Sequence, residues 1–231
     1  MPAHRFFLDT TFSDKTALLE GDEFHHLKNV MRARPGDNIE IVNGKGTLVH
    51  ACLVEIKNNS ALFEITQKID EPPPSCILIL AQAFTRPALL DWIIEKGTEL
   101  GADEFWLFPG DQSEKKELTS HQLDRLHTLT LSALKQCGRL YLPSIRLKPS
   151  LSQWEKPQGT LLFGSLKPHA MPLQKNYPSP IIITIGPEKG FSTQEETLLG
   201  TKLQATGITL HRNILRAETA ALCALSLLSQ S

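Results

Sequence analysis

The sequence lacks an excess of charge of either sign. Its 24 lysines and arginines are matched by 25 acidic residues, and the formal net charge is −1 over 231 residues. Proteins that bind nucleic acids usually carry a basic face, so the bulk charge does not indicate such a partner, and any positive surface must be local. With 41% hydrophobic and 21% charged residues, the composition is ordinary for a soluble globular protein.

Cysteine is scarce, and several common motifs are absent. The four cysteines lie far apart with no C-x-x-C pair, which argues against a zinc site and fits a reducing compartment. The first residues lack the apolar core of a signal peptide, and no apolar run is long enough to span a bilayer. A G-x-G-x-x-G fingerprint and a Walker loop are also missing, which disfavours binding of nucleotide phosphates. We therefore expect a cytoplasmic protein that holds no metal and contacts no membrane.

Residues 1–70 contain several short strands joined by turns. Candidate strands cover residues 5–8, 38–42, 48–56 and 61–67, and Asn43-Gly44 between two of them is a strong hairpin signal. One amphipathic helix, residues 22–31, interrupts the strands. Short strands connected in this way predict a small β-barrel.

The helix at residues 22–31 and the segment after it form the most basic local feature. Between Phe24 and Gly36 lie two histidines, Lys28, Arg32 and Arg34, and no acid. A solvated helix face is the ordinary interpretation of a charged run. The absence of acidic residues also makes a surface that contacts RNA phosphates plausible.

The proline-rich segment 71–75 predicts an extended linker and a domain boundary. After it, strands at residues 76–84, 105–108, 161–163, 181–185 and 208–210 alternate with helices at 87–101 and 119–137. A last apolar helix starts near Arg216 and runs to about Leu228. This alternation predicts a layered α/β domain with a mostly parallel sheet and helices on both faces. The predicted organisation is therefore a domain over 1–70, a linker over 71–75 and an α/β domain over 76–231.

A glycine-bearing turn follows the isoleucine-rich strand at residues 181–185. Gly186-Pro187 ends the strand, and Gly190 offers a position where the backbone can approach a ligand. Ser192 and Glu195 have the spacing of a capping box that starts a helix. Open α/β sheets bind ligands at such places, beyond the carboxyl ends of their strands, although an ordinary turn is the alternative.

Two motifs carry a family resemblance. G-P-E-x-G-F-S at 186–192 and N-I-L-R-x-E-T-A at 213–220 resemble the C-terminal signature of the RsmE family, the 16S ribosomal RNA uracil-N3 methyltransferases of the SPOUT class. Further landmarks follow in family order at residues 5–7, 26–32, 36–37, 95–101 and 136–139, with Pro143 after them. The resemblance therefore spans nearly the whole chain.

The resemblance implies a PUA-like RNA-binding barrel at the N-terminus and a SPOUT-like domain whose last segment, about 181–231, is tied in a trefoil knot. The sequence alone would not suggest a knot, because threaded chains are very rare. The resemblance also implies S-adenosyl-L-methionine as cofactor, 16S ribosomal RNA of the small subunit as partner, and a homodimer.

The implied reaction moves a methyl group from a sulfonium to N3 of an unpaired uridine. Catalysis then needs positioning and stabilisation of negative charge as N3 loses its proton. Arg216 is the first candidate, because an arginine stays cationic and can donate to a uracil carbonyl, and Glu188 is a second catalytic candidate that could orient it. Neither Glu188 nor Glu218 is assigned as a general base.

The remaining candidates come from family positions and, for Lys28, Arg32 and Arg34, from the basic segment described above. The expected cofactor contacts are Gly164, Ile185, Gly186, Glu188, Gly190, Ile214, Leu215, Glu218 and Thr219. The expected RNA contacts are Arg5, Lys28, Arg32, Arg34, Lys96 and Arg139.

Some positions depart from the family pattern. Lys189 replaces a glycine, His211 replaces a glycine, and Asn213 stands where an arginine is typical. Lys115 similarly occupies a position in a serine-rich arginine motif. These departures keep two alternatives open: a SPOUT methyltransferase with another RNA target, including a ribose 2′-OH, or a non-catalytic RNA-binding or ribosome-assembly protein.

Overall fold

The computed structural model describes residues 4–13 and 15–229, which form two compact units. The N-terminal unit comprises the residues up to Pro73 together with Leu131–Leu142, and the C-terminal unit comprises Pro74–Thr130 and the residues from Pro143 onward. The sequence prediction placed residues 131–142 in the second domain. They group with the first because Leu134 and Leu140 pack in one buried cluster with Val42 and Leu48.

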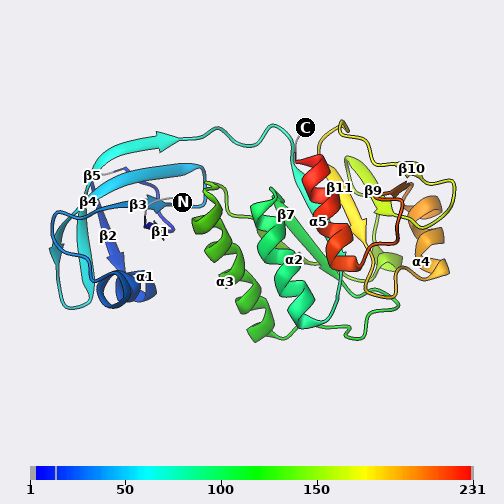
Figure 1. Ribbon diagram of the computed structural model, residues 1–231, viewed down its shortest axis with the longest axis horizontal. Coiled ribbons are helices and arrows are strands. Elements are labelled where there is room, and N and C mark those ends of the chain that lie inside the picture. The colour runs from blue at the N-terminus through cyan, green and yellow to red at the C-terminus, as the bar shows by residue number, and fades with distance from the viewer. Residues whose placement is uncertain (1–3, 14, 230–231) are drawn as a thin grey trace. The chain divides into compact units, whose positions relative to one another are not determined.

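The N-terminal unit is built on a curled five-stranded sheet (Figure 1). Its strand order is β1-β3-β4-β5-β2, with β1 parallel to β3 and all other pairs antiparallel. Irregularities in β4 after His50 and after Leu53 help the sheet to bend, as β-bulges do. The strands are β1 (Arg5–Phe7), β2 (Thr16–Glu20), β3 (Asn38–Val42), β4 (Thr47–Ile56) and β5 (Ser60–Asp70).

The predicted helix at residues 22–31 is present, but its second half is wider than an α-helix. α1 (Gly21–His25) continues as a π-helix over His26–Met31. Phe24 and Leu27 are buried against the sheet, whereas the apolar side chain of Val30 is exposed. The wider turn rotates Val30 outward, because the regular 3.6-residue spacing no longer applies.

The C-terminal unit contains a seven-stranded sheet in which every pair is parallel, as the sequence predicted. The order is β10-β12-β9-β11-β6-β7-β8. β11 lies at the centre and is fully buried, which explains its run of isoleucines. The strands are β6 (Leu78–Ala83), β7 (Glu104–Phe108), β8 (Ser144–Leu147), β9 (Thr160–Gly164), β10 (Met171–Pro172), β11 (Ile181–Ile185) and β12 (Thr206–Thr209).

Helices cover both faces of this sheet. α2 (Pro87–Glu99), α5 (Ala217–Leu228) and the first part of α3 (Ser120–Cys137) contribute to a cluster on one face. α4 (Thr193–Thr197), its π-helical continuation Leu198–Lys202 and the 3₁₀ turn Leu151–Gln153 lie toward the other face, where Leu199 and Leu151 are buried. Ile181 and Ile183 belong to the first cluster and Ile182 to the second, as strand alternation requires.

The last part of the chain crosses back over the sheet. β12 pairs with β9, whereas α5, which follows it, packs against α2, β6 and β11 (Figure 1). This return is compatible with the knot expected over residues 181–231, and the threading itself stays a prediction. Among the helices of the described residues, none is both long and apolar enough to cross a membrane.

Candidate functional site

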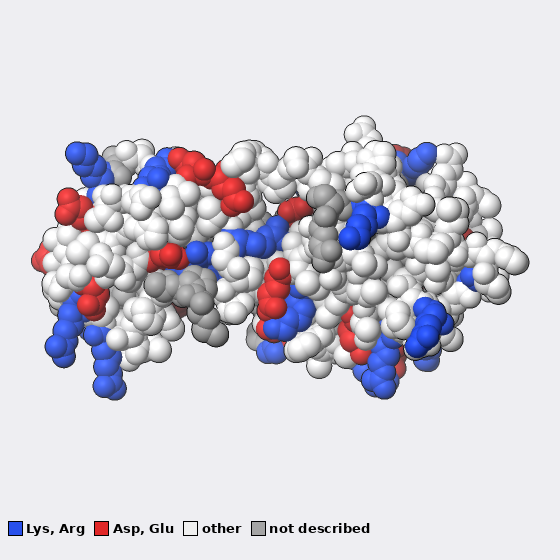
Figure 2. Space-filling model, turned by 45° about the horizontal axis from the view of Figure 1, so that its top comes forward, with Lys and Arg blue, Asp and Glu red and all other residues white. Residues whose placement is uncertain are grey.

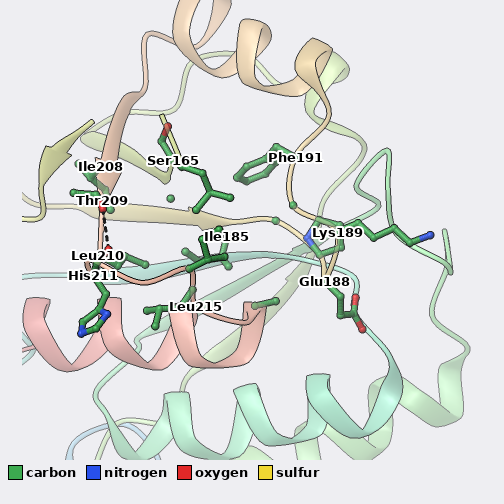
Figure 3. A pocket seen from close by; sticks show the side chains of 18 of the residues that line it. Ser165, Ile185, Glu188, Lys189, Phe191, Ile208, Thr209, Leu210, His211 and Leu215 are labelled. Carbon is green, nitrogen blue, oxygen red and sulfur yellow. Dashed lines mark hydrogen bonds between the residues drawn. The ribbon is translucent and has the colours of Figure 1, made fainter. Parts of the chain in front are cut away.

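A cavity of about 360 Å³ opens at the carboxyl ends of three neighbouring strands (Figure 3). Its walls come from the ends of three strands and the residues that follow them: 164–166 at the end of β9, 185–191 at the end of β11, and 208–211 and 213–215 at the end of β12. Glu196, Ala217 and Ala220 complete the lining. The position and size suit a small ligand bound at the carboxyl edge of a parallel sheet.

The turn after β11 depends on two glycines. Gly190 donates its N–H to the carbonyl of Pro187 at 2.8 Å and has φ +77°. A Cβ on Gly186 would lie 3.0 Å from the backbone of both Gly190 and Phe191. Lys189 does not occupy the left-handed region, so its replacement of the family glycine needs no unusual backbone angle. Its side chain points away from the cavity (Figure 3).

A buried glutamine that the sequence analysis did not single out joins the two central strands behind this turn. Gln82 in β6 is fully buried, and its Nε2 donates to the carbonyls of Ala83 at 3.0 Å and Gly186 at 3.1 Å. The bond to Gly186 holds the start of the turn against β6. The sequence did offer a signal for this contact, because Gln82 is a polar residue within an otherwise apolar strand.

The predicted capping box is present and does more than cap a helix. Ser192 Oγ accepts from the N–H of Glu195, and Glu195 Oε2 accepts from the N–H of Ser192. Glu195 is 2% exposed, and its Oε1 also accepts from the N–H of Asp111 at 2.9 Å. Burial raises the pKa of Glu195 above its usual range. The carboxyl group therefore links the turn to the loop after β7.

Glu188 lines the cavity, but its carboxylate binds the backbone at the N-terminus of α2. Oε1 accepts from the backbone N–H of Arg86 at 2.9 Å, directly before α2. A carboxylate stabilises this position because a helix N-terminus carries partial positive charge. Among the described contacts there is none between Glu188 and Arg216, so the suggested orientation of Arg216 by Glu188 is not seen.

Seven of the nine predicted cofactor residues line the cavity. These are Gly164, Ile185, Gly186, Glu188, Gly190, Ile214 and Leu215. Glu218 is half-buried, and its Oε2 has no partner among the described atoms, whereas Thr219 is exposed; neither lines the cavity. Arg216 is exposed at the N-cap of α5, between the lining residues Leu215 and Ala217.

Apolar side chains and peptide groups make up most of the cavity wall. Phe191 packs edge-on against Phe163 with ring centroids 6.2 Å apart. At the rim, the Nδ1 atom of His211 accepts from the N–H of Asn213 at 3.1 Å. A slot of this kind suits a flat heterocycle such as adenine. Phe191, His211 and Asn213 were not predicted as lining residues, although Phe191 and Asn213 belong to the two motifs and His211 lies between β12 and the second motif.

Comparisons with known proteins agree with this geometry. A family model described as an RNA methyltransferase domain matches residues 72–229, and one described as an RNA methyltransferase PUA domain matches residues 19–66. Ribosomal RNA small subunit methyltransferase E of Mesomycoplasma hyopneumoniae is 31% identical over 177 residues, covering 74% of this chain and 77% of that protein. The chain belongs to the ribosomal RNA small subunit methyltransferase E family.

Other members match almost end to end, and they confirm the resemblance to this family. The Bacillus subtilis protein of the same name is 28% identical over 253 residues, covering 97% of this chain and 95% of its own. The crystal structure of the Neisseria gonorrhoeae member, bound to S-adenosyl methionine, has a TM-score of 0.86 and 28% identity, covering 97% of this chain and 95% of that one.

The family's PUA region contains three of the predicted RNA contacts, all in exposed positions. Lys28 lies on the π-helix with its ammonium 5.5 Å from the centre of the Phe24 ring. Arg32 directly follows with φ +53°, and Arg34 is held by a bond from its N–H to Asp37 at 2.7 Å. In the view of Figure 2, basic side chains are interspersed with acidic ones and do not form one continuous basic face.

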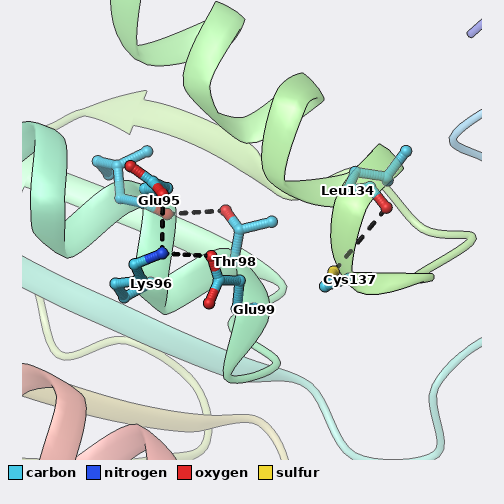
Figure 4. A network of polar contacts seen from close by, with 7 residues as sticks. Glu95, Lys96, Thr98, Glu99, Leu134 and Cys137 are labelled. Carbon is cyan, nitrogen blue, oxygen red and sulfur yellow. Dashed lines mark hydrogen bonds and ion pairs between the residues drawn. The ribbon is translucent and has the colours of Figure 1, made fainter. Parts of the chain in front are cut away.

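Two other predicted RNA contacts are engaged within the protein. The guanidinium of Arg5 donates twice to Glu40, at 2.8 and 2.7 Å, and its side chain is 8% exposed. The ammonium of Lys96 binds Glu95 and Glu99 at 2.8 and 2.7 Å (Figure 4). The geometry of both favours a structural role, and Arg139 is half-buried at the end of α3.

Proposed function

We propose that this protein transfers a methyl group from S-adenosyl-L-methionine to ribosomal RNA of the small subunit. The observation that carries the proposal is the cavity, because the residues of the two signature motifs converge on it from separate strand ends. A family member of the same fold, from Neisseria gonorrhoeae, has been crystallised with this cofactor bound.

The residues present fit the cofactor. Gly186 and Gly190 leave peptide groups accessible in the wall, and Ile185, Phe191 and Leu210 supply apolar surface for an adenine ring. When bound, the cofactor supplies an electrophilic methyl group on a sulfonium. The chain's task is then to hold the acceptor nucleotide in line with that methyl group and to keep water out.

The finer proposal is methylation at N3 of a uridine in 16S ribosomal RNA. Loss of the N3 proton leaves negative charge on the uracil ring, and a fixed cation stabilises it. Arg216 is exposed beside the cavity with no described partner, so its guanidinium is available to a uracil carbonyl. Glu188 is better placed to fix the start of α2 than to exchange a proton with substrate, because its Oε1 accepts from the N–H of Arg86.

Further parts of the proposal concern domains, partners and location. The segment 1–70 would bind RNA as a PUA-like domain through Lys28, Arg32 and Arg34, linked by residues 71–75 to a methyltransferase domain over 76–231. We further propose that the protein is a homodimer and that it acts on small ribosomal subunits in the cytoplasm. The proposed reaction uses no metal ion. Within the described residues, no group of three or more His, Cys, Asp or Glu is arranged to hold a metal.

The test combines cofactor binding with mapping of the product. Calorimetric titration with S-adenosylmethionine should show binding by the wild type, loss of binding in Gly190→Val, and retention in Arg216→Ala. Gly190→Val should abolish binding because a β-branched residue is strained at φ +77°. Methylation of 16S ribosomal RNA or small subunits, followed by mass spectrometry of nucleosides, should yield N3-methyluridine with wild type and little with Arg216→Ala.

The alternatives give different results in the same experiment. A ribose-methylated nucleoside would replace the N3 assignment with a 2′-O reaction. Binding of RNA by a folded protein without cofactor binding or product would instead indicate a non-catalytic RNA-binding or assembly protein.

A further inference from the structure

The helices α2 and α5 pack against each other, and both begin near the cavity. Ala217 of α5 lines it, and the N–H of Arg86 before α2 is bound by the lining residue Glu188. A Cβ on Gly97 of α2 would lie 3.2 Å from Leu225 of α5, and one on Gly101 would lie 3.3 Å from Ser229. Since both pairs have the same offset, the last turns of the two helices run side by side in the same direction. Arg86 and Arg216 are the N-cap residues of these two helices. Two arginines therefore begin two helices that pack against each other.

Both the backbone and the side chain of Arg86 form hydrogen bonds that fix its position. Its backbone N–H is bound by Glu188, a residue of the cavity wall, and its Nη2 donates to Glu114 at 3.1 Å. The side chain nevertheless remains 67% exposed. An exposed guanidinium is thus held next to the cavity by a contact to the same turn that forms the cavity wall.

Two acids, Glu114 and Glu188, lie near Arg86 at this rim and balance the charges of Arg86 and Lys189. Lys189, on the same turn, also lies close enough to Glu114 to favour its charged form. The carboxylate of Glu188 is occupied by the backbone of α2, and the helix start adds partial positive charge of its own. Glu114 is an exposed surface partner of Arg86, and such a pair is weak enough for an anion to displace it.

We propose that Arg86 binds a backbone phosphate of the RNA next to the nucleotide that enters the cavity, while Arg216 faces the base. This rests on the proposed function, because it requires an RNA nucleotide at the cavity. A nucleotide inserted at the carboxyl edge of the sheet carries its phosphates to the rim, where the planar guanidinium fork matches phosphate geometry. In the absence of RNA, Glu114 pairs with the guanidinium of Arg86. The phosphate displaces Glu114 when RNA binds.

The structural alternative is a simple surface ion pair that tethers the loop carrying Glu114 to α2. The two roles predict opposite effects of removing Glu114. A tether is broken equally by Arg86→Ala and by Glu114→Gln. A phosphate contact is lost only in Arg86→Ala, whereas Glu114→Gln frees the guanidinium and removes a negative charge that repels RNA.

The experiment measures binding of purified small ribosomal subunits and methylation kinetics at several salt concentrations. For Arg86→Ala we expect roughly a ten-fold rise in Kd and KM for the subunit, from loss of one charge-assisted contact. The slope of log K against log salt should fall by about 0.7, and kcat and cofactor affinity should stay near wild type. Glu114→Gln should bind RNA as tightly as wild type or several-fold more tightly, and Arg86→Lys should recover part of the loss.

Arg125→Ala is a control, because Arg125 is an arginine of similar exposure, 61%, that pairs with one acid, the partly buried Asp91. It should change neither RNA affinity nor the salt slope. The inference is overturned if Arg86→Ala behaves like Arg125→Ala, or if Arg86→Ala and Glu114→Gln weaken RNA binding alike. Failure of the wild type to methylate RNA would overturn the proposed function instead, and the binding measurement would still decide the role of Arg86.

Discussion

Glu195 should be the residue outside the cavity whose loss most disturbs it. Its carboxyl group accepts the N–H groups of Ser192 and Asp111, each at 2.9 Å, from two segments about 80 residues apart. Glu195→Ala leaves both donors without their acceptor. An unsatisfied buried donor costs about 1–3 kcal/mol. Because Asp111 is exposed and Ser192 half-buried, water replaces part of each bond, and we expect a total loss of roughly 2–3 kcal/mol.

Such a loss should be visible in two assays. Differential scanning calorimetry should show a melting temperature about 5–10 °C lower in Glu195→Ala, since 1 kcal/mol corresponds to about 2–4 °C in a protein of this size. Cofactor affinity should fall about five-fold, because Phe191 of the cavity wall directly precedes Ser192. Glu55→Ala, which removes an exposed acid paired with Lys57, should change neither quantity measurably. A melting temperature of Glu195→Ala within 1 °C of wild type would refute the reasoning.

The raised pKa of Glu195 adds a pH dependence with a defined sign. Burial makes the folded protein hold this proton more tightly than the unfolded chain does. The stabilising contribution of the protonated form is therefore complete below the usual value of about 4.5 and is lost as pH rises through the folded pKa. The free energy of unfolding of the wild type, relative to that of Glu195→Gln, should therefore decrease as pH rises from about 4.5 toward neutrality. A difference that grows in favour of wild type over that range would contradict the assignment.

Two further substitutions test the turn and the strand behind it. Gly186→Ala places a Cβ 3.0 Å from the backbone of Gly190 and Phe191, so cofactor affinity measured by calorimetry should fall at least ten-fold; Gly200→Ala, with nothing within 4 Å, should bind normally. Gln82→Leu removes the bond to the Gly186 carbonyl and should lower the free energy of unfolding in urea by about 1–3 kcal/mol; an unchanged midpoint would show that the bond contributes nothing.

The elements with strong periodic patterns were predictable from the sequence. The apolar strands β6 and β11, the hairpin at Asn43 and the amphipathic helix α2 all form close to their predicted bounds. The strands β2, β8 and β10 were missed because they are short edge strands of their sheets whose pairing is decided by tertiary contacts. The end of α3 groups with the N-terminal unit by its contacts, which its own pattern does not reveal.

The candidate site divides in the same way. The glycine turn and the capping box are local, so their residues could be named from spacing alone. The bonds from Gln82 to Gly186, from Glu188 to Arg86 and from Glu195 to Asp111 join segments about 80–100 residues apart, and no local pattern encodes them. A motif can show that Glu188 matters without showing that its carboxylate faces α2.

The departures from the family pattern alter the rim of the cavity and leave its inner wall in place. The left-handed backbone position in the turn belongs to Gly190, so Lys189 causes no strain and directs its side chain outward. His211 and Asn213 compensate each other, because the imidazole accepts the N–H of Asn213 and so orders a loop that lacks the family's glycine and arginine. Substitutions that abolished cofactor binding would be expected at Gly186 or Gly190, where a side chain would clash or be strained. Both glycines are retained, which favours an active methyltransferase with a modified RNA-facing rim over a protein that has lost its catalytic pocket.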